Sequence, residues 1–441
     1  MNTLSNKSCI PVVMLMASCL LRPEFAFAWP EEGRASISPT LVELEPGETQ
    51  QFVATMLPRR LQPAWPADGV KWSVNGVAGG GNDIGRIDGR GLYRAPDNTP
   101  ECGELHIAAE VPDATNPVLF ATILIKGANH AYRRVKTWDQ TEVEKSGLKD
   151  PRGIALDSKG SLLIADMQQA NILHFSNDGA YLGPFGLGPD GKTIAHEGMC
   201  VVAVHPDGRV FAADRKTGPP RVEAFDADGN WLFGFAPKGA QRWMVAEPSG
   251  LAFRPNGDIF LADMDAMRVA VYDGKGKLRG LLREHAPDGN RFNAPSGAAF
   301  DPAGDLFVSS LYGPCEKLCA DTGERVFAFA YPEPPGGLMF IDDLCIDRWG
   351  NVFLAVRCAA DPVESGPEGG GVATVLKFNN HGDFLTRIEL SANAPARASV
   401  AIDSQDRVYV AYSEGEDEDK TAGIEIFEQK SAAAKQAGGG S

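Results

Sequence analysis

The sequence has few of the features that mark a metalloenzyme or a nucleic-acid-binding protein. Its 7 histidines are scattered along 441 residues, and it contains no HExxH, GxSxG, CxxCH or phosphate-binding glycine-rich pattern. Basic residues are outnumbered, since 42 Lys and Arg face 58 Asp and Glu and give a net charge of -16. An acidic chain is repelled by polyanions, so nucleic acid and anionic membrane surfaces are poor partners.

Long apolar runs are also missing, apart from a short one near the N-terminus. That run, Ile10 to Leu21, is shorter than the ~20 residues a membrane-spanning helix needs, so we expect no membrane span. It follows Lys7 and precedes Ala26-Phe27-Ala28, the small-x-small pattern that signal peptidase cuts. We therefore expect residues 1–28 to be a signal peptide and the protein to be periplasmic or extracellular. Lipid attachment at Cys19 is a minor alternative.

Cysteine is sparse as well. Of the 8 cysteines, Cys9 and Cys19 fall within residues 1–28, and the other six are too few for a disulfide scaffold in a chain of this length. One disulfide, between Cys315 and Cys358, is compatible with the sequence, because both residues follow equivalent strand ends in adjacent repeats of the alignment given below.

The chain does contain many short alternating apolar segments separated by Gly, Pro, Asn and Asp, which indicates antiparallel β-structure. We expect residues 34–127 to form a β-sandwich with Trp72 in its core. The runs PGETQQFVAT at 46–55, VKWSVNG at 70–76 and IGRIDGRGLYRAP at 84–96 resemble the bacterial Ig-like domains of secreted and surface proteins. This resemblance implies a spacer, adhesion or docking module.

Residues 130–428 repeat one template six times, the sixth time in degenerate form. Each copy has a short strand, a turn, an apolar strand and a strand ending in an aromatic residue. The equivalent turn positions lie 46 to 56 residues apart, at Gly160, Gly208, Gly257, Gly304, Gly350 and Asp406. A period in the forties with four strands per repeat is typical of propeller blades. The predicted fold is all-β, an Ig-like sandwich followed by a six-bladed β-propeller, with residues 429–441 as a flexible tail.

The template, PRGIALDSKGSLLIAD at 151–166, resembles the NHL repeat, and the resemblance covers residues 130–428. Proteins that share this fold include scaffolds, extracellular binding modules and some enzymes, such as lactonases and amidating lyases. The three-histidine zinc site of the amidating lyases has no counterpart here, because only His196 falls near a channel mouth.

The last repeat is one strand short. After Phe427 only a few residues precede a tail rich in Ser, Ala and Gly, whereas each earlier copy continues into a fourth strand. An unpaired sheet edge would remain unless another segment covered it. We predict that Tyr132 to Trp138, just before the first repeat, pairs with the last repeat and closes the ring.

The alignment also gives structural roles to several conspicuous residues. Cys345 aligns with alanines and Cys319 with aromatic residues, so we expect both to be packing residues. Asp166, Asp214 and Asp263 recur at one template position, and we expect them to hydrogen-bond the turn that follows rather than to bind metal.

The expected binding site is the mouth of the central channel, where the first strand of each repeat begins. Its equivalent positions are Arg152, Cys200, Ser249, Ser296, Asp342 and Ala398. The residues predicted to contact a ligand there are Arg152, His196, Glu197, Asp342, Asp343, Arg357 and Tyr412. The plain alternative for the same residues is a solvated rim.

We therefore expect a non-catalytic exported binding or scaffold protein without a cofactor, whose channel-mouth face binds an unidentified protein or small ligand. The alternative is a metal-assisted enzyme of the lactonase or lyase kind. In that case Asp342 and Asp343 would hold a divalent cation such as Ca²⁺ by oxygen ligation.

Overall fold

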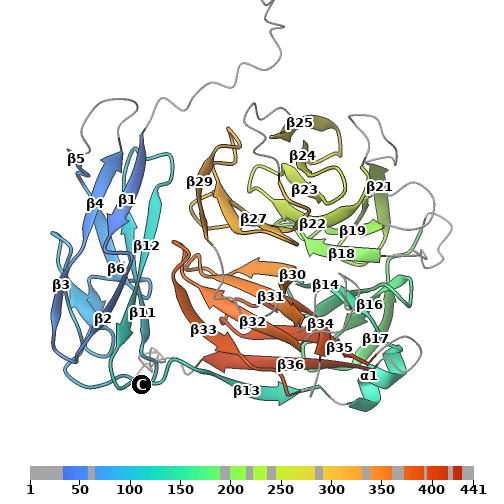
Figure 1. The fold of residues 1–441 in the computed structure, drawn as a ribbon, viewed down its shortest axis with the longest axis horizontal. Helices are drawn as coiled ribbons and strands as arrows, with labels where there is room; N and C mark the ends of the chain where they lie inside the picture. Colours follow the sequence, from blue (N-terminus) through green and yellow to red (C-terminus); the bar gives the residue numbers. More distant parts are fainter. Residues whose placement is uncertain are drawn as a thin grey trace, which may run out of the picture.

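The structure is a computed structural model. It describes residues 33–57, 65–138, 140–188, 199–214, 222–235, 245–283, 292–329, 338–359, 372–391, 395–415 and 421–429. Within these ranges the chain is nearly all β-strand, with one short helix, α1 (Gln140–Ser146). Figure 1 shows an N-terminal domain, blue to cyan, standing beside a ring of sheets. No helix in the described ranges is long and apolar enough to cross a membrane.

The N-terminal domain consists of three sheets around one core. Their strands, in order across each sheet, are β1 (Arg34–Ser38), β4 (Val53–Leu57) and β5 (Trp65–Pro66); β3 (Thr49–Gln51), β10 (Leu92–Arg94), β9 (Gly85–Ile87) and β8 (Gly80–Gly81); and β2 (Leu41–Leu44), β12 (Val118–Ile125), β11 (Glu104–Glu110), β6 (Lys71–Val74) and β7 (Val77–Ala78). Trp72 is buried in the shared core with Phe52 and Tyr93, which confirms its predicted inward position.

The rest of the described chain forms six four-stranded antiparallel sheets. Blades 1 to 3 are β14 (Pro151–Leu156), β15 (Leu162–Asp166), β16 (Asn171–Phe175) and β17 (Tyr181–Phe185); β18 (Met199–Val204), β19 (Val210–Asp214), β20 (Val222–Phe225) and β21 (Trp231–Phe235); and β22 (Pro248–Phe253), β23 (Ile259–Asp263), β24 (Arg268–Tyr272) and β25 (Leu278–Leu282). Their first strands pack side by side around a channel, as in a β-propeller.

Blades 4 to 6 complete the ring, and the first strand of blade 6 contacts that of blade 1. Their strands are β26 (Pro295–Phe300), β27 (Leu306–Ser310), β28 (Cys315–Leu318) and β29 (Arg325–Phe329); β30 (Leu338–Ile346), β31 (Val352–Ala359), β32 (Val372–Phe378) and β33 (Phe384–Ile388); and β34 (Pro395–Ile402), β35 (Val408–Glu414), β36 (Thr421–Gln429) and β13 (Tyr132–Thr137). The six-bladed propeller predicted from the repeats is therefore confirmed.

The ring closes through the segment predicted to supply the missing strand of the last repeat. β13, which precedes blade 1 in sequence, pairs antiparallel with β36 and supplies the outer strand of blade 6. Trp138 follows at once and is buried against Phe175 of blade 1, with ring centroids 5.1 Å apart. The segment thus joins blade 6 to blade 1 through both backbone pairing and an aromatic contact.

The alignment of the degenerate sixth repeat is confirmed by its backbone. The turn glycines of the first five repeats have positive φ, for example +79° at Gly160, and Asp406 takes φ +62° at the equivalent position. Asp and Asn are the non-glycine residues that tolerate this left-handed conformation best.

Asp166 has the predicted structural role in the turn that follows, whereas Asp263 accepts N–H bonds from Ala246 and Glu247, in the segment that enters its first strand. The Asp166 carboxylate accepts N–H bonds from Gln168 and Gln169 in the following turn, at 2.9 and 2.7 Å. It also accepts from Lys149 and Asp150, at 2.7 and 2.9 Å, which fixes the segment entering the first strand.

Two of the cysteine predictions need correction. Leu318, not Cys319, pairs with Leu306 in the slot that Phe175 fills in blade 1, and Cys319 begins the next turn, so the alignment was one residue out. Cys315 is a free buried thiol, so the Cys315–Cys358 disulfide is not formed. Cys315 starts a third strand whereas Cys358 lies on a second strand, β31, so the two positions are not equivalent. Cys345 packs against the core between blades 5 and 6, as predicted.

The N-terminal domain is held against the propeller by buried polar contacts. Lys377 of β32 donates to Glu104 of β11 at 2.5 Å, with both side chains at most 2% exposed. Trp349, in the β30–β31 turn, stacks on His106 with centroids 5.0 Å apart. In Figure 1, β29 and β33 are the strands turned toward this domain. The two domains therefore share a packed interface.

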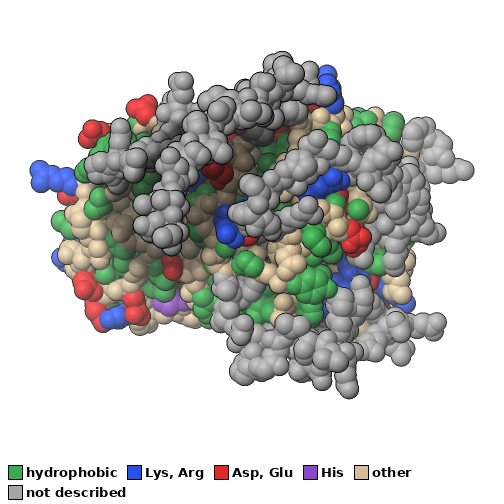
Figure 2. All heavy atoms as spheres, turned by 45° about the horizontal axis from the view of Figure 1, so that its top comes forward, with side chains coloured by type: hydrophobic (Ala, Val, Ile, Leu, Met, Phe, Trp, Pro, Cys, Tyr) green, Lys and Arg blue, Asp and Glu red, His purple; other side chains and the backbone are tan. Residues whose placement is uncertain are grey.

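The negative net charge is not gathered into one patch on the face seen in Figure 2. Acidic and basic side chains lie interspersed there with apolar ones. The acidic balance therefore does not single out a charged docking surface on that face.

Candidate functional site

In blades 1 to 5 the first strand has a bulge at the same position, near the channel mouth. In blades 1 to 5 the register between the first and second strands shifts by one residue at the same place. The residue left out of the pairing is, in turn, Arg152, Cys200, Ser249, Ser296 and Asp342. Such a bulge bends the strand and redirects a side chain. In blade 6 the shift comes earlier, at Ala396, and Ala398 pairs normally with Tyr412.

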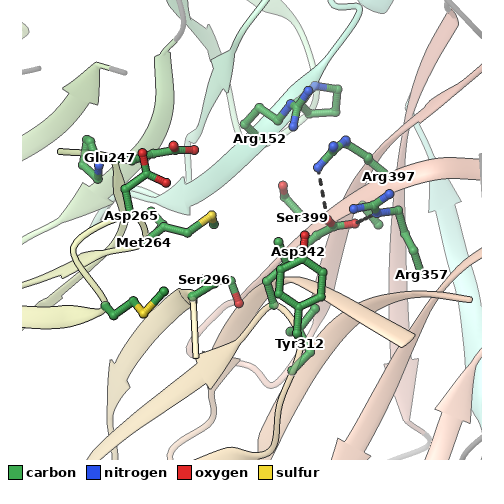
Figure 3. Close-up of a pocket in the computed structure, with 18 residues that line it drawn as sticks. Arg152, Glu247, Met264, Asp265, Ser296, Tyr312, Asp342, Arg357, Arg397 and Ser399 are labelled. Carbon is green, nitrogen blue, oxygen red and sulfur yellow. Dashed lines mark hydrogen bonds and ion pairs between the residues drawn. The ribbon is translucent and has the colours of Figure 1, made fainter. Parts of the chain in front are cut away.

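A cavity of about 310 Å³ opens at this mouth. It is lined by Arg152, Ser249, Ser296, Asp342 and Ala398, five of the six positions that the alignment placed there. The turns after the second strands of blades 3 and 4 add Met264, Asp265 and Tyr312 to the lining, and the second strand of blade 5, β31, adds Arg357. Figure 3 shows these side chains converging from several blades on one space.

One side of the cavity carries three arginines held by aspartates. Arg357 Nε donates to Asp342 Oδ2 at 2.6 Å, and Arg397 Nη1 donates to Asp342 Oδ1 at 3.2 Å, the contact dashed in Figure 3. Arg152 donates twice to Asp150, each time at 3.0 Å. The side chain of Arg357 is 1% exposed, that of Arg397 14% and that of Arg152 9%. All three guanidiniums are therefore held in largely buried positions.

The other side of the cavity is acidic, hydroxylated and apolar. Glu247 precedes β22 and Asp265 follows β23, and Figure 3 places them across the cavity from Arg357 and Arg397. Met264 adds apolar surface next to them, whereas Figure 3 places Tyr312 beside Asp342. The cavity is therefore divided by charge, with guanidiniums on one side and carboxylates on the other.

Asp343 lies one residue further along β30, in the wall of the channel below this cavity. It stands where blades 1, 3 and 4 have glycine, so it is a carboxyl in a wall built largely of small and apolar residues. Burial raises the pKa of the Asp343 carboxyl to about 7, although Val400 and Leu344 donate N–H bonds to it at 3.1 and 2.8 Å. The neighbouring Asp342 charge adds to the rise.

The structure gathers some of the predicted ligand-binding residues and not others. Arg152, Asp342 and Arg357 line the cavity, and Asp343 lines the channel beneath it. Tyr412 does not line the cavity, because its hydroxyl lies over Gly423 on the neighbouring strand of blade 6. His196 and Glu197 lie outside the described residues.

Three prominent lining residues were missed from the sequence. Arg397 stands where blades 1, 3 and 4 have proline at the start of the first strand, and this break in the template could have drawn attention to it. Glu247 and Asp265 lie just outside the strands of blade 3, where the template specifies no residue type. Only the three-dimensional arrangement identifies them.

The residues do not fit the cation site of the alternative hypothesis. Both oxygens of Asp342 accept from guanidinium groups, whose positive charge opposes a divalent ion at that carboxylate. Asp343 points its oxygens at backbone N–H groups. Across the described ranges, no group of three or more His, Cys, Asp or Glu is arranged to hold a metal ion.

Comparison with known proteins identifies no family. No protein-family model and no curated protein matches the chain. Among solved structures, virginiamycin B lyase from Staphylococcus aureus is 12% identical, with 66% of this chain and 88% of that one covered and a TM-score of 0.42. A structure described as a putative gluconolactonase is 16% identical, with 67% of this chain and 91% of that one covered and a TM-score of 0.45. The WD40 β-propeller domain of Doa1 is 13% identical over 69% and 99%, with a TM-score of 0.43. At these identities and scores, the likenesses say nothing about what this chain binds or catalyses.

Proposed function

We propose that the protein is an exported, non-catalytic binding protein that holds a small anionic ligand at the mouth of its propeller channel. One observation carries this proposal. Arg152, Arg357 and Arg397 come from three consecutive blades of the ring, 1, 5 and 6, and meet on one side of a cavity of about 310 Å³. That volume lies at the small end of the range of ligand pockets, which suits a metabolite-sized molecule.

The aspartates support this function by fixing the guanidiniums before a ligand arrives. Asp342 holds two of them and Asp150 holds the third through a bidentate contact. A guanidinium carries five N–H donors in a planar fork that matches a carboxylate or phosphate. Side chains already held in place lose little conformational entropy on binding, so affinity is gained by preorganisation.

The remaining parts of the chain supply export and support in this proposal. Residues 1–28 act as the signal peptide, the N-terminal domain is an Ig-like module, and the blades are NHL repeats. Mass spectrometry of protein recovered from the periplasm or medium should then find a chain that begins at Trp29. A chain that begins at Met1, or a lipid on Cys19, would contradict this part.

The cation-dependent enzyme is supported less well, because guanidiniums surround the carboxylate that would have to bind the ion. Asp342→Asn separates the two hypotheses. The variant should still bind anions, since one negative charge leaves the cavity although two guanidiniums lose part of their support. A metal site at Asp342 and Asp343 would instead lose its Ca²⁺ affinity.

Calorimetric titration with acetate, butyrate, succinate and inorganic phosphate tests the proposal. Arg397→Gln is the main variant, because Arg397 is the most accessible of the three arginines. Arg279→Gln is the control, since Arg279 is 60% exposed and lies outside the cavity. We expect at least one anion to bind the wild type and the control equally, and to bind Arg397→Gln about tenfold more weakly, as for loss of a charge-assisted hydrogen bond. Equal binding by all three proteins, or none by any, would contradict the proposal.

A further inference from the structure

We infer that the ligand of this site is a zwitterion, a small molecule that carries an ammonium group as well as its anionic group. This inference rests on the proposed function and adds the chemical class of the ligand. It comes from the way the blades distribute charge around the mouth. The three arginines belong to consecutive blades 5, 6 and 1, whereas Glu247 and Asp265 both belong to blade 3.

The ring places these two groups opposite each other. The first strands contact one another in the order of blades 1 to 6, and blade 6 contacts blade 1, so blade 3 lies across the channel from blade 6. Arg397 belongs to blade 6, and Arg357 and Arg152 belong to the blades on either side of it. Figure 3 shows the same separation, with Glu247 and Asp265 on the far side of the cavity from Arg397.

The acidic side is built into the fold of blade 3. Asp263 accepts the N–H of Glu247 at 2.9 Å, and the Glu247 carbonyl accepts the N–H of Met264 at 2.8 Å. These two bonds tie together the segment before β22 and the turn after β23, the two places from which Glu247 and Asp265 project. Two carboxylates on neighbouring, mutually fixed backbone segments form a complementary partner for one ammonium group.

Among the described residues, those that line the space between the charged sides are neutral. The Ser249 hydroxyl donates to the Pro295 carbonyl at 2.5 Å, and the Ser296 and Ser309 hydroxyls lie 3.0 Å apart, so both serines use their hydroxyls within the protein. Met264 and Tyr312 contribute thioether and aromatic surface. A short aliphatic or peptide backbone between an anionic and a cationic end matches this order of groups.

Matched probes of one carbon skeleton test the inference. We would titrate the full-length mature protein with 6-aminohexanoate, hexanoate and hexylamine, and repeat the set with the four-carbon series. The zwitterion should bind at least tenfold more tightly than the anion of the same length, and the amine should bind most weakly. Glu247→Gln combined with Asp265→Asn should reduce the zwitterion to the affinity of the anion, while the affinity for hexanoate stays equal or rises.

The outcomes separate this inference from the proposed function. If hexanoate binds as tightly as 6-aminohexanoate in both series, the ligand is an anion alone and the inference is wrong, although the anion-binding function stands. If the double variant keeps the full preference for the zwitterion, Glu247 and Asp265 do not bind the ammonium group and the inference is again wrong. If no probe binds, both fail. The exposed Glu110→Gln variant of the N-terminal domain is the control for a general effect of removing a negative charge.

Discussion

The buried ion pair between the two domains allows a quantitative prediction. Glu104 and Lys377 are 1% and 2% exposed, and they form the most deeply buried of the described contacts between the N-terminal domain and the propeller. Gln429 donates to Glu104 at 2.8 Å, and the Lys377 ammonium lies 5.3 Å from the Tyr132 ring. Replacing one partner by a neutral residue of the same size, as in Glu104→Gln, leaves the other charge buried without its counter-ion.

Removing one partner of a buried pair costs about 3–5 kcal/mol of folding free energy. If the domains unfold together, roughly 400 residues at about 2.1 cal/mol/K each give an unfolding entropy near 0.8 kcal/mol/K, so Tm should fall by about 4–6 °C. If the N-terminal domain unfolded alone, its much smaller entropy would turn the same free energy into a loss of about 15 °C or more for that domain. We expect the first behaviour, one transition with the smaller shift, because the interface is packed.

Differential scanning calorimetry at pH 7 of Glu104→Gln, Lys377→Met and the double variant provides the assay. The double variant should lose much less stability than the two single variants added together, because a neutral pair has no charge left to desolvate. Glu110→Gln breaks the exposed Lys71–Glu110 pair and should change stability by less than about 0.5 kcal/mol. A shift below 1 °C for Glu104→Gln, or strict additivity in the double variant, would refute the reasoning.

The pH dependence of this pair follows from the same contacts. Burial is the largest single influence and opposes ionisation of Glu104, but the charge of Lys377, the interaction with His106 and the hydrogen bonds from Lys377 and Gln429 together lower the pKa of the Glu104 carboxyl overall. The stabilisation is therefore present at neutral pH and is lost as pH falls through that lowered value.

Three further predictions concern the propeller itself. The pKa of Asp343 is raised from 3.8 to about 7, so ionisation of this carboxyl destabilises the native state as pH rises. In urea titrations, the stability of Asp343→Asn relative to wild type should therefore increase by about 2–3 kcal/mol between pH 5 and pH 8. A difference that stays constant with pH would contradict the raised pKa. Trp138→Ala should lower the free energy of unfolding by about 3–5 kcal/mol in the same assay, because it leaves a cavity beside Phe175 where the ring closes. Asp166→Ala should cost about 3 kcal/mol or more because four backbone N–H groups lose their acceptor, whereas Asp178→Ala, in an exposed turn, should cost under about 1 kcal/mol.

Most of the fold could be predicted because its determinants are local and repeated. A positive-φ turn position is visible as glycine five times, and the sixth copy carries Asp406, which tolerates the same conformation. The closing strand could be predicted from the absence of a fourth strand after Phe427. The misplacement of Cys319 shows the limit, because blade 4 lacks the aromatic residue that fixes the alignment in the other blades and Leu318 fills its place.

The candidate site was predictable only where it coincides with the template. Arg152 and Asp342 are bulge residues in the repeat, so counting along each copy locates them. Glu247 and Asp265 lie in connecting segments, where nothing in the repeat constrains the side chain. The ion pair between Asp342 and Arg397 joins blades 5 and 6, and its two residues are 55 positions apart in the sequence. No local sequence pattern predicts it. That ion pair turns the predicted metal ligand into the anchor of an arginine cluster.

The origin of the last strand has a consequence for biosynthesis. β13 is made before blade 1, but its partner β36 is made only after the strands of blades 1 to 5, so the ring of sheets cannot close before Gln429 has been synthesised. The N-terminal domain, by contrast, is synthesised before the propeller. Blade 6 therefore assembles against a domain that can already be folded. A nascent chain released before Thr421 would therefore carry an open arc of sheets with two raw edges, a species prone to aggregate.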